Sequence, residues 1–284
     1  MKICWFDDNR FGIIDGDEVV DVSGALAALP TPVYPAAHGD LLMANLDAVL
    51  AAAAPLMASG ARKPVSEAKF HSPSANPSKV IGVPVNYLKH IEEAENDKAA
   101  FTDRYAGGVI DQGLFLKANS ALVGNSAGLT IRFPERRTDH EMELGVIIGK
   151  TANRVSEADA LDYVAGYAIA LDFVVRGPED RSFRKSCDSF AMVGPWMVTA
   201  DEIADPDALD ISLAVNGDMR QQSNTGSMIL NVRKQISWAS EFYTLYPGDI
   251  IMTGTCEGVD PVVAGDVMAC EIQDIGAMNV VVNG

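Results

Sequence analysis

The sequence predicts a mainly β protein with some α structure (α+β), divided into a small N-terminal α+β domain over residues 1–75 and a larger domain over residues 76–284. Two observations support this prediction. The first 22 residues contain three short strand-like runs separated by acidic and glycine turns, which is typical of a β meander. The larger part consists of short apolar runs split by Gly and Asp or Asn, which favours a sheet-rich core.

The elements of the N-terminal part follow from local composition. Strands are expected over residues 2–6, 11–14 and 18–22. Residues 41–57 are rich in Ala and Leu and predict a helix, with Gly60 as its stop signal. Pro64–Pro77 carries scattered Pro, Ser and Asn, so we expect a linker there and place the domain boundary near residue 75.

The larger part is predicted to be a mainly β core with a few helices. Strands are expected, among others, over Lys79–Val85, Leu144–Ile148, Tyr167–Val175, Ile211–Val215, Asp249–Met252, Asp266–Ile272 and Asn279–Val282. One helix is expected over Ser156–Val164, where Ser156 and Asp159 have the spacing of a capping box. Another is expected over Asn231–Tyr243.

The charge balance argues against several classes of function. Lys and Arg total 22 and Asp and Glu total 39, which gives a formal net charge of −17. A protein that binds nucleic acids or anionic membranes needs clustered Lys and Arg side chains on its surface, so neither is an expected partner. No apolar run approaches the ~20 residues of a membrane helix. The four cysteines lack zinc-ligand spacing and the first ten residues lack the apolar core of a signal peptide, so we expect a cytoplasmic protein.

Three acids alternate just before an apolar run, at Asp139, Glu141 and Glu143. On a strand they would share one face, with neighbouring side chains roughly 6–7 Å apart. Like charges so placed repel unless water or a cation neutralises them. A solvated strand face is one interpretation. The buried run Leu144–Ile148 that follows favours the other, a cation bound where the strand begins.

A further acid, Asp172, stands inside the apolar run Tyr167–Val175. Burying a lone carboxylate is costly unless it is paired or bound to a metal, so Asp172 is either a structural hydrogen-bonded residue or a ligand. Together with Glu141 and Glu143 it would offer three oxygen ligands. Such a set suits Mg²⁺, Mn²⁺ or Ca²⁺ better than Zn²⁺.

A histidine and an acid stand three residues apart after the strand Lys79–Val85. On a helical turn His90 and Glu93 would be neighbours, and the carboxylate could orient the imidazole as a general base for water. The alternative is a surface histidine on a polar helix. Weaker candidates, each of which could equally be a surface charge or a turn residue, are Lys117, Arg176, Lys185 and Thr255.

These segments, in this order, resemble the fumarylacetoacetate hydrolase family over residues 78–284. The matching motifs are Gly82 with Asn86-Tyr87, His90 and Glu93; Phe115-x-Lys117; Glu141-x-Glu143-Leu144; Asp172 with Arg176; Lys185-Ser186-x-Asp188 with Gly194-Pro195-Trp196; Asn216-Gly217 with Gln221 and Asn224-Thr225; and Pro247-Gly248-Asp249 with Thr253-Gly254-Thr255. The first 75 residues resemble the family's small N-terminal domain less specifically.

The resemblance implies a mixed β-roll around a central site, a homodimer, and a divalent cation, Mg²⁺ or Mn²⁺ or else Ca²⁺. It also implies roles for individual residues: metal ligands Glu141, Glu143 and Asp172; catalytic residues His90, Glu93 and Lys117; and substrate-binding residues Tyr87, Arg176, Lys185 and Thr255.

The expected activity is metal-dependent hydrolysis of a carbon–carbon bond in a 1,3-dicarbonyl oxo acid, resembling an acylpyruvate or fumarylacetoacetate. One alternative is a decarboxylase, hydratase or isomerase acting on a related 2-oxo acid, and His90 separates these because decarboxylation needs no water-activating base. Another alternative is a non-catalytic metal-binding protein. The polar stretch 91–112 between His90 and Lys117 is expected to form a lid that closes over substrate, with a cleavage site for proteases near Arg104.

Overall fold

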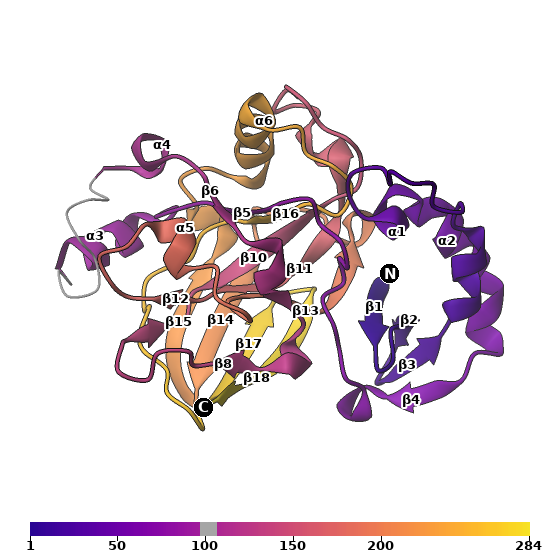
Figure 1. Ribbon diagram of the computed structural model, residues 1–284, viewed down its shortest axis with the longest axis horizontal. Coiled ribbons are helices and arrows are strands. Elements are labelled where there is room, and N and C mark those ends of the chain that lie inside the picture. Colours follow the sequence, from indigo (N-terminus) through magenta and orange to yellow (C-terminus); the bar gives the residue numbers. More distant parts are fainter. Residues whose placement is uncertain (97–106) are drawn as a thin grey trace.

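The computed structural model describes residues 1–96 and 107–284. Its largest sheet, counted over these residues, has eleven strands in the order β4-β3-β2-β1-β13-β11-β10-β16-β5-β6, with β7 beside β13 (Figure 1). The bounds are β1 Lys2–Phe6, β2 Arg10–Asp15, β3 Glu18–Asp21, β4 Arg62–Pro64, β5 Val80–Gly82, β6 Phe115–Lys117, β7 Leu122–Val123, β10 Met142–Ile148, β11 Val164–Asp172, β13 Ala191–Thr199 and β16 Ile250–Met252.

A second sheet packs beside the first. Its order is β15-β14-β17-β18-β8, and its strands are β8 Leu129–Thr130, β14 Asp210–Val215, β15 Asp218–Asn224, β17 Val267–Ile272 and β18 Gly276–Asn283. A short pair joins β9 (Thr138–Asp139) to β12 (Val174–Val175). The seven strands predicted for the larger part are all present within a few residues of their expected bounds. Together with the helices, these sheets confirm the mainly β, α+β class.

The strands β10 and β11 form the centre of the large sheet. Every residue of β10 is buried, because side chains on both faces of this strand pack into hydrophobic clusters. Leu144, Val146 and Ile148 belong to one cluster, whereas Ile147 belongs to the other. The acids that begin β10 therefore stand at the end of a strand covered on both sides.

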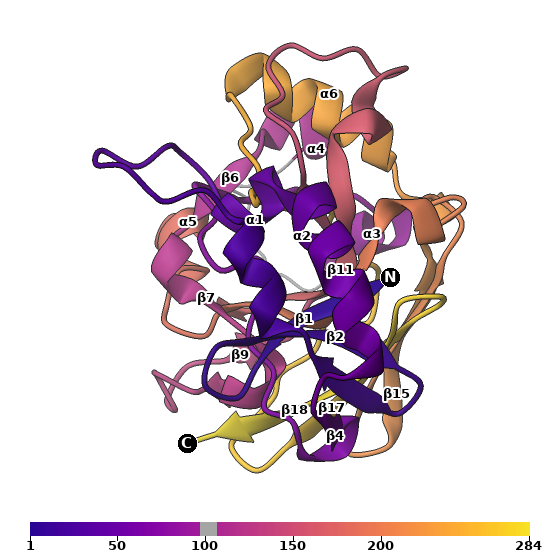
Figure 2. The same ribbon diagram turned by 90° about the vertical axis from the view of Figure 1, so that its right-hand side faces the viewer.

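Within the described residues, one strand pair brings the N-terminal meander into the large sheet. β1 pairs antiparallel with β13, so the predicted meander continues the large sheet. The helices α1 (Leu41–Ala44) and α2 (Leu46–Ala53) lie over its strands (Figure 2), and Val49 and Ala53 pack with Ile3 and Phe11. The position of a domain boundary near residue 75 stays a prediction.

Two of the three helix predictions need correction. The expected helix 41–57 is divided into α1, α2 and a 3₁₀ helix over Ala54–Ala58, because Asn45 leaves helical geometry and Pro55 tightens the last turns. The prediction of a helix over Ser156–Val164 is wrong, because the structure has only a 3₁₀ helix at Ala160–Tyr163 in this range. Val164 already belongs to strand β11. The third helix is confirmed as α6 (Val232–Phe242).

Helix α6 begins where its capping residue predicts. The Asn231 side chain accepts a hydrogen bond from the Lys234 amide at 3.0 Å, which satisfies one of the free amides at the helix start. Two shorter helices, α4 (Val109–Gln112) and α5 (Arg181–Arg184), lie near β6 (Figure 1).

The predicted lid lies only partly within the described residues. Its first part is helix α3 (Leu88–Asn96), which confirms a helical setting for His90 and Glu93, and its end is α4. Residues 97–106, including Arg104, lie outside the described residues, so the lid stays a prediction. Among the residues that are described, no helix has the length and apolar character needed to cross a membrane.

Candidate metal and catalytic site

Two strand ends bring three carboxylates together. Glu141 lies just before β10, Glu143 lies within it, and Asp172 ends β11. The antiparallel register pairs Met142 with Leu171, and the Asp172 amide donates to the Glu141 carbonyl at 2.9 Å. One carboxylate oxygen from each of the three acids lies within 4.8 Å of the others, and all three residues are buried. The sheet register therefore assembles the predicted ligand set.

Burial and charge act differently on these acids. Burial raises the pKa of Glu143 well above its usual value, and the charges of Asp172 and Glu141 raise it further. Burial also opposes ionisation of Glu141, but the positive charges of Lys185 and Arg176 outweigh it and lower the pKa of that carboxyl. Of these two acids, Glu143 is thus the one whose ionisation is opposed by the neighbouring negative charges. A bound cation would offset that repulsion.

Two buried lysines contact the same carboxylates. Lys117, the last residue of β6, donates through Nζ to Asp172. Lys185, directly after α5, donates through Nζ to Glu141 at 2.5 Å and to Asp172 at 2.6 Å. Burial lowers the pKa of Lys117, although the Asp172 charge opposes this effect. The structure therefore brings both predicted lysines to the carboxylate cluster.

Two arginines form ion pairs with Asp139, the first of the three alternating acids. Arg176 donates through Nε to Asp139 at 2.8 Å and through Nη2 to Glu141 at 3.3 Å. Arg137 donates through Nε to the other oxygen of Asp139 at 2.6 Å. Asp139 is therefore an ion-pair partner, whereas Glu141 and Glu143 join the carboxylate cluster. All three acids are buried, so the interpretation as a solvated strand face is wrong. Substrate contact by Arg176 stays a prediction.

The predicted pair of His90 and Glu93 is formed on α3. The His90 Nδ1 donates to Glu93 Oε2 at 3.0 Å, and the Gly258 amide donates to Oε1 at 3.0 Å. Burial opposes ionisation of Glu93, but these hydrogen bonds lower its pKa. His90 is 3 % exposed, and its positive form lowers the pKa of Glu141. The pair therefore stands beside the carboxylate cluster, and the interpretation as a surface histidine is wrong.

A buried asparagine fixes the turn that carries this pair. The Asn86 Nδ2 donates to the carbonyls of Leu230 at 2.9 Å and Thr253 at 2.8 Å, and Oδ1 accepts from the Leu230 amide at 2.8 Å. Tyr87 follows and is 1 % exposed, so burial raises its pKa, and the charge of Glu143 adds to the effect. This turn places Tyr87 and α3 next to the loop that follows β16.

That loop borders the carboxylate cluster. The Gly254 amide donates to Glu143 Oε2 at 2.8 Å. This position requires glycine, since its φ is +95° and a Cβ would lie 2.6 Å from the Cβ of Asn86. Thr255 is buried, and its hydroxyl donates to the Met142 carbonyl at 2.8 Å. Substrate contact by Thr255 stays a prediction. Sequence reasoning missed the role of Gly254, which the run Thr253-Gly254-Thr255 presented only as a turn.

The donor set fits a divalent cation. Glu141, Glu143 and Asp172 provide carboxylate oxygens alone, and oxygen ligands suit hard ions such as Mg²⁺, Mn²⁺ and Ca²⁺. Their burial and the raised pKa of Glu143 show that like charges are crowded where such an ion would be held. Three protein ligands also leave coordination positions for water and substrate.

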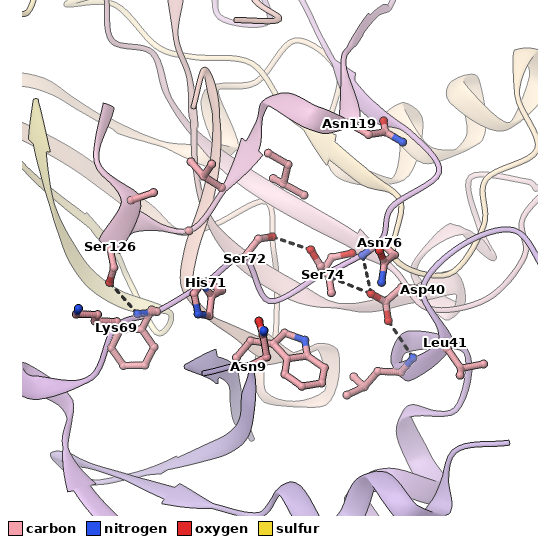
Figure 3. A pocket seen from close by; sticks show the side chains of 18 of the residues that line it. Asn9, Asp40, Leu41, Lys69, His71, Ser72, Ser74, Asn76, Asn119 and Ser126 are labelled. Carbon is pink, nitrogen blue, oxygen red and sulfur yellow. Dashed lines mark hydrogen bonds between the residues drawn. The ribbon is translucent and has the colours of Figure 1, made fainter. Parts of the chain in front are cut away.

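A separate pocket of about 720 Å³ lies between the N-terminal segment and the main body (Figure 3). Trp5 and Phe70 line it together with Leu122. The Asp40 carboxylate at its edge accepts hydrogen bonds from four amides, those of Leu42, Met43, Ala75 and Asn76. None of the carboxylate-cluster residues lines this pocket, so it is distinct from the cluster.

Comparison with known proteins identifies the family of the chain. The profile of the fumarylacetoacetate (FAA) hydrolase C-terminal family matches residues 79–283. The chain is 48 % identical to a maleylpyruvate hydrolase of Aquipseudomonas alcaligenes, with 99 % of each chain covered. It is 36 % identical to a mitochondrial oxaloacetate tautomerase of Rattus norvegicus, with 93 % of this chain and 83 % of the relative covered.

A solved structure extends this similarity to the whole fold. The maleylpyruvate hydrolase of Sphingobium sp. SYK-6, solved in complex with manganese(II) ion and pyruvate, superposes with a TM-score of 0.84. The two chains are 39 % identical, and the match covers 100 % of this chain and 99 % of that one. The chain therefore belongs to the fumarylacetoacetate hydrolase family.

Proposed function

We propose that this protein hydrolyses maleylpyruvate, an acylpyruvate. The observation that carries this proposal is the 48 % identity, over essentially the full length of both chains, to a maleylpyruvate hydrolase. The broader class is firm: the chain is a divalent-metal-dependent hydrolase that cleaves a carbon–carbon bond in a 1,3-dicarbonyl oxo acid.

Glu141, Glu143 and Asp172 are the proposed ligands of the cation, which we take to be Mn²⁺ in preference to Mg²⁺ or Ca²⁺. The manganese complex of the Sphingobium relative supports this choice, and the all-oxygen donor set is compatible with it. When bound, the cation supplies Lewis-acid stabilisation of negative charge at the oxo-acid end of the substrate.

His90 is the proposed general base. The Glu93 carboxylate accepts a hydrogen bond from His90 Nδ1 at 3.0 Å, which places the proton of the neutral imidazole on Nδ1. Nε2 is then the basic nitrogen of the ring, and we propose that it takes a proton from water. The hydrogen bond from Gly258 to the other oxygen of Glu93 fixes the carboxylate and so fixes the plane of the imidazole. The pair thus holds a base of defined tautomer beside the cluster.

The reaction balances as a hydrolysis. Water loses a proton to His90, and its hydroxide adds to the carbonyl carbon beyond the methylene group. The bond between these two carbons then breaks, and its electron pair remains with the methylene carbon as the enolate of pyruvate. The proton returns from His90 to that carbon. The products are pyruvate and a carboxylate, which is maleate when the substrate is maleylpyruvate.

Cationic side chains stabilise the charge that develops in this sequence. Lys117 is proposed to stabilise the oxyanion formed when hydroxide adds, and Lys185 to bind the substrate. Both lie at the carboxylate cluster, where burial excludes water and strengthens such contacts. Tyr87, Arg176 and Thr255 are the further proposed substrate-binding residues, because each is buried close to the cluster. Arg176 contacts Glu141, Thr255 donates to the Met142 carbonyl, and the charge of Glu143 acts on Tyr87.

A second candidate is isomerisation of a 2-oxo acid. The 36 % identity to an oxaloacetate tautomerase is the observation that favours it. Tautomerisation moves a proton without adding water, so the organic products distinguish the two activities. Hydrolysis of an acylpyruvate releases pyruvate and a second acid, whereas tautomerisation conserves the carbon skeleton.

We further propose a homodimer located in the cytoplasm. Light scattering should give twice the mass of 30.3 kDa at micromolar concentration. A mass equal to that of one chain would contradict the dimer.

An activity screen tests the function directly. Purified protein, stripped with a chelator and reloaded with Mn²⁺, Mg²⁺ or Ca²⁺, is assayed for pyruvate release from maleylpyruvate and other acylpyruvates. Oxaloacetate is included, with its keto–enol conversion followed by absorbance. Pyruvate and maleate in equal amounts would support the proposal. Keto–enol conversion without any pyruvate release from acylpyruvates would replace it with the tautomerase.

A further inference from the structure

The start of β10 is held by a closed ring of hydrogen bonds. The Met142 amide donates to Gln221 Oε1 at 3.0 Å, and Gln221 Nε2 donates to the Thr255 hydroxyl at 2.7 Å. That hydroxyl donates in turn to the Met142 carbonyl at 2.8 Å. We call these three residues the Met142 ring. Two side chains thus satisfy both backbone polar groups of a single strand residue.

The ring stands where the neighbouring strand turns away. β10 pairs with β16 as far as Gly145 and Met252, and the Thr253 amide still donates to the Leu144 carbonyl at 3.1 Å. The chain then turns at Gly254, whose φ is +95°. The N–H and C=O of a strand residue point to the same side of the strand. Beyond the end of β16, the amide of Gln221 and the hydroxyl of Thr255 can therefore take the place of the backbone hydrogen bonds that a neighbouring strand would make to Met142.

Burial makes the ring costly to break. Gln221 is 1 % exposed and Thr255 is 2 % exposed, so their polar atoms depend on protein partners. The orientation of the Gln221 amide follows from those partners: Nε2 also faces the Cys256 carbonyl at 3.0 Å, whereas Oε1 faces the Met142 N–H.

The same amide oxygen also binds the side chain of the residue before Glu141. Gln221 Oε1 accepts from His140 Nδ1 at 3.0 Å, and an amide oxygen can only accept, so Nδ1 carries the proton. His140 and Met142 are the residues on either side of Glu141, and Met142 also precedes Glu143. One buried oxygen therefore fixes both flanks of a proposed metal ligand.

We propose that Gln221 is a positioning residue for the carboxylate cluster. It reaches across from β15 in the five-stranded sheet and fixes where Glu141 and Glu143 stand relative to Asp172. Its hydrogen bonds go to His140, Met142, Thr255 and Cys256, so it acts through the residues that flank the ligands and not by direct contact with the ligands. This inference rests on the proposed function of the cluster as a metal site.

A matched pair of variants tests the role. Gln221→Met removes the amide at similar length, whereas Gln222→Met makes the same change at the exposed neighbour. Gln221→Met should weaken Mn²⁺ binding about 10- to 100-fold by calorimetry, the range for residues that orient metal ligands. It should also change the paramagnetic resonance spectrum of bound Mn²⁺, and Gln222→Met should change neither. A lower melting temperature with unaltered affinity and spectrum would overturn the proposal.

A double-variant cycle tests the ring itself. Thr255→Val removes the hydroxyl and opens the ring at another point. Because either change breaks the same closed set of bonds, the double variant should bind Mn²⁺ about as weakly as Gln221→Met alone. Full additivity of the two losses would show that the residues act separately, and would overturn the ring.

Hydrogen exchange separates this inference from the metal assignment. In chelator, the Met142 amide of Gln221→Met should exchange about tenfold faster or more than that of the parent. Unchanged exchange would overturn the positioning role even if Mn²⁺ binding is lost in Glu141→Ala. If Glu141→Ala instead retains full Mn²⁺ affinity, that result overturns both the metal site and the positioning role. It does so regardless of the hydrogen-exchange rate of the Met142 amide.

Discussion

The Lys185 ammonium and the Glu141 carboxylate are 2.5 Å apart, and both side chains are buried. The same ammonium lies 2.6 Å from Asp172. Two proposed ligands of the cation are thus also the partners of a lysine. A bound cation would share these two carboxylates with Lys185, so each positive charge would weaken the binding of the other.

Replacing Lys185 should separate stability from metal affinity. Lys185→Met leaves two buried carboxylates with fewer cationic partners, so in chelator the free energy of unfolding should fall by about 3 kcal/mol. The same change removes a competing charge, so Mn²⁺ should bind about tenfold more tightly. Denaturant unfolding and calorimetry measure the two effects, with the exposed Lys234→Met as control. Weaker Mn²⁺ binding in Lys185→Met would show that the lysine supports the ion rather than competing with it.

Removing a ligand should abolish tight metal binding while the fold survives. Glu141→Ala and Glu143→Ala should each weaken Mn²⁺ binding by more than about 100-fold, since even residues that only orient ligands cost 10- to 100-fold. Calorimetric titration checks this, and circular dichroism checks the fold. The exposed Glu271→Ala should match the parent. Parental affinity in both site variants would refute the ligand assignment.

Metal binding should release a proton. Before a cation binds, the raised pKa of Glu143 keeps its carboxyl protonated at a higher pH than an exposed glutamic acid. The cation requires the carboxylate, so affinity should rise with pH up to that pKa and level off above it. Below the pKa it should fall by up to about tenfold per pH unit. Calorimetry in two buffers of different ionisation enthalpy counts the protons. A Mn²⁺ affinity that does not depend on pH, with no proton released on binding, would contradict the raised pKa of Glu143.

His90 should be needed for turnover but not for the metal. His90→Ala removes the proposed base and should lower kcat on an acylpyruvate by about 10²–10⁴ while Mn²⁺ affinity stays close to that of the parent. The exposed His38→Ala is the matched control. Rates and calorimetry together decide the matter: a rate within threefold of the parent would make His90 a bystander.

Local sequence pattern was enough to predict how the acids of β10 and the pair of His90 and Glu93 are arranged. Alternation placed Glu141 and Glu143 on one strand face, and a spacing of three placed Glu93 against His90, as the structure has them. Both relationships depend only on residues close in sequence, which strand and helix periods fix. The position of Asp172 beside them depends on the register between β10 and β11, which the chain pattern alone does not determine.

Partners that come from distant segments could not be predicted. Asp139 pairs with Arg176, 37 residues away, which makes it an ion-pair partner in an acid row that looked uniform in sequence. Gln221 stands in a strand so polar that nothing marks its side chain as buried. The helix expected from Ser156 failed for the opposite reason. The predicted contact between Ser156 and Asp159 does form, since the Ser156 hydroxyl donates to the Asp159 carboxylate at 2.7 Å. Val164, however, pairs with Ile148 in the sheet, so the chain continues as a strand rather than as a helix.

The pairing of β1 with β13 has a consequence for how the chain is made. Lys2 lies opposite Val198, so the sheet joins residues almost two hundred positions apart. At about 5–20 residues per second, a ribosome delivers β13 roughly 10–40 s after β1. During that interval the free edge of the meander offers unpaired amides and carbonyls to any other strand. A nascent or truncated chain that lacks residues 191–199 therefore exposes a template for pairing with a neighbour, and the finished protein hides it within its own sheet.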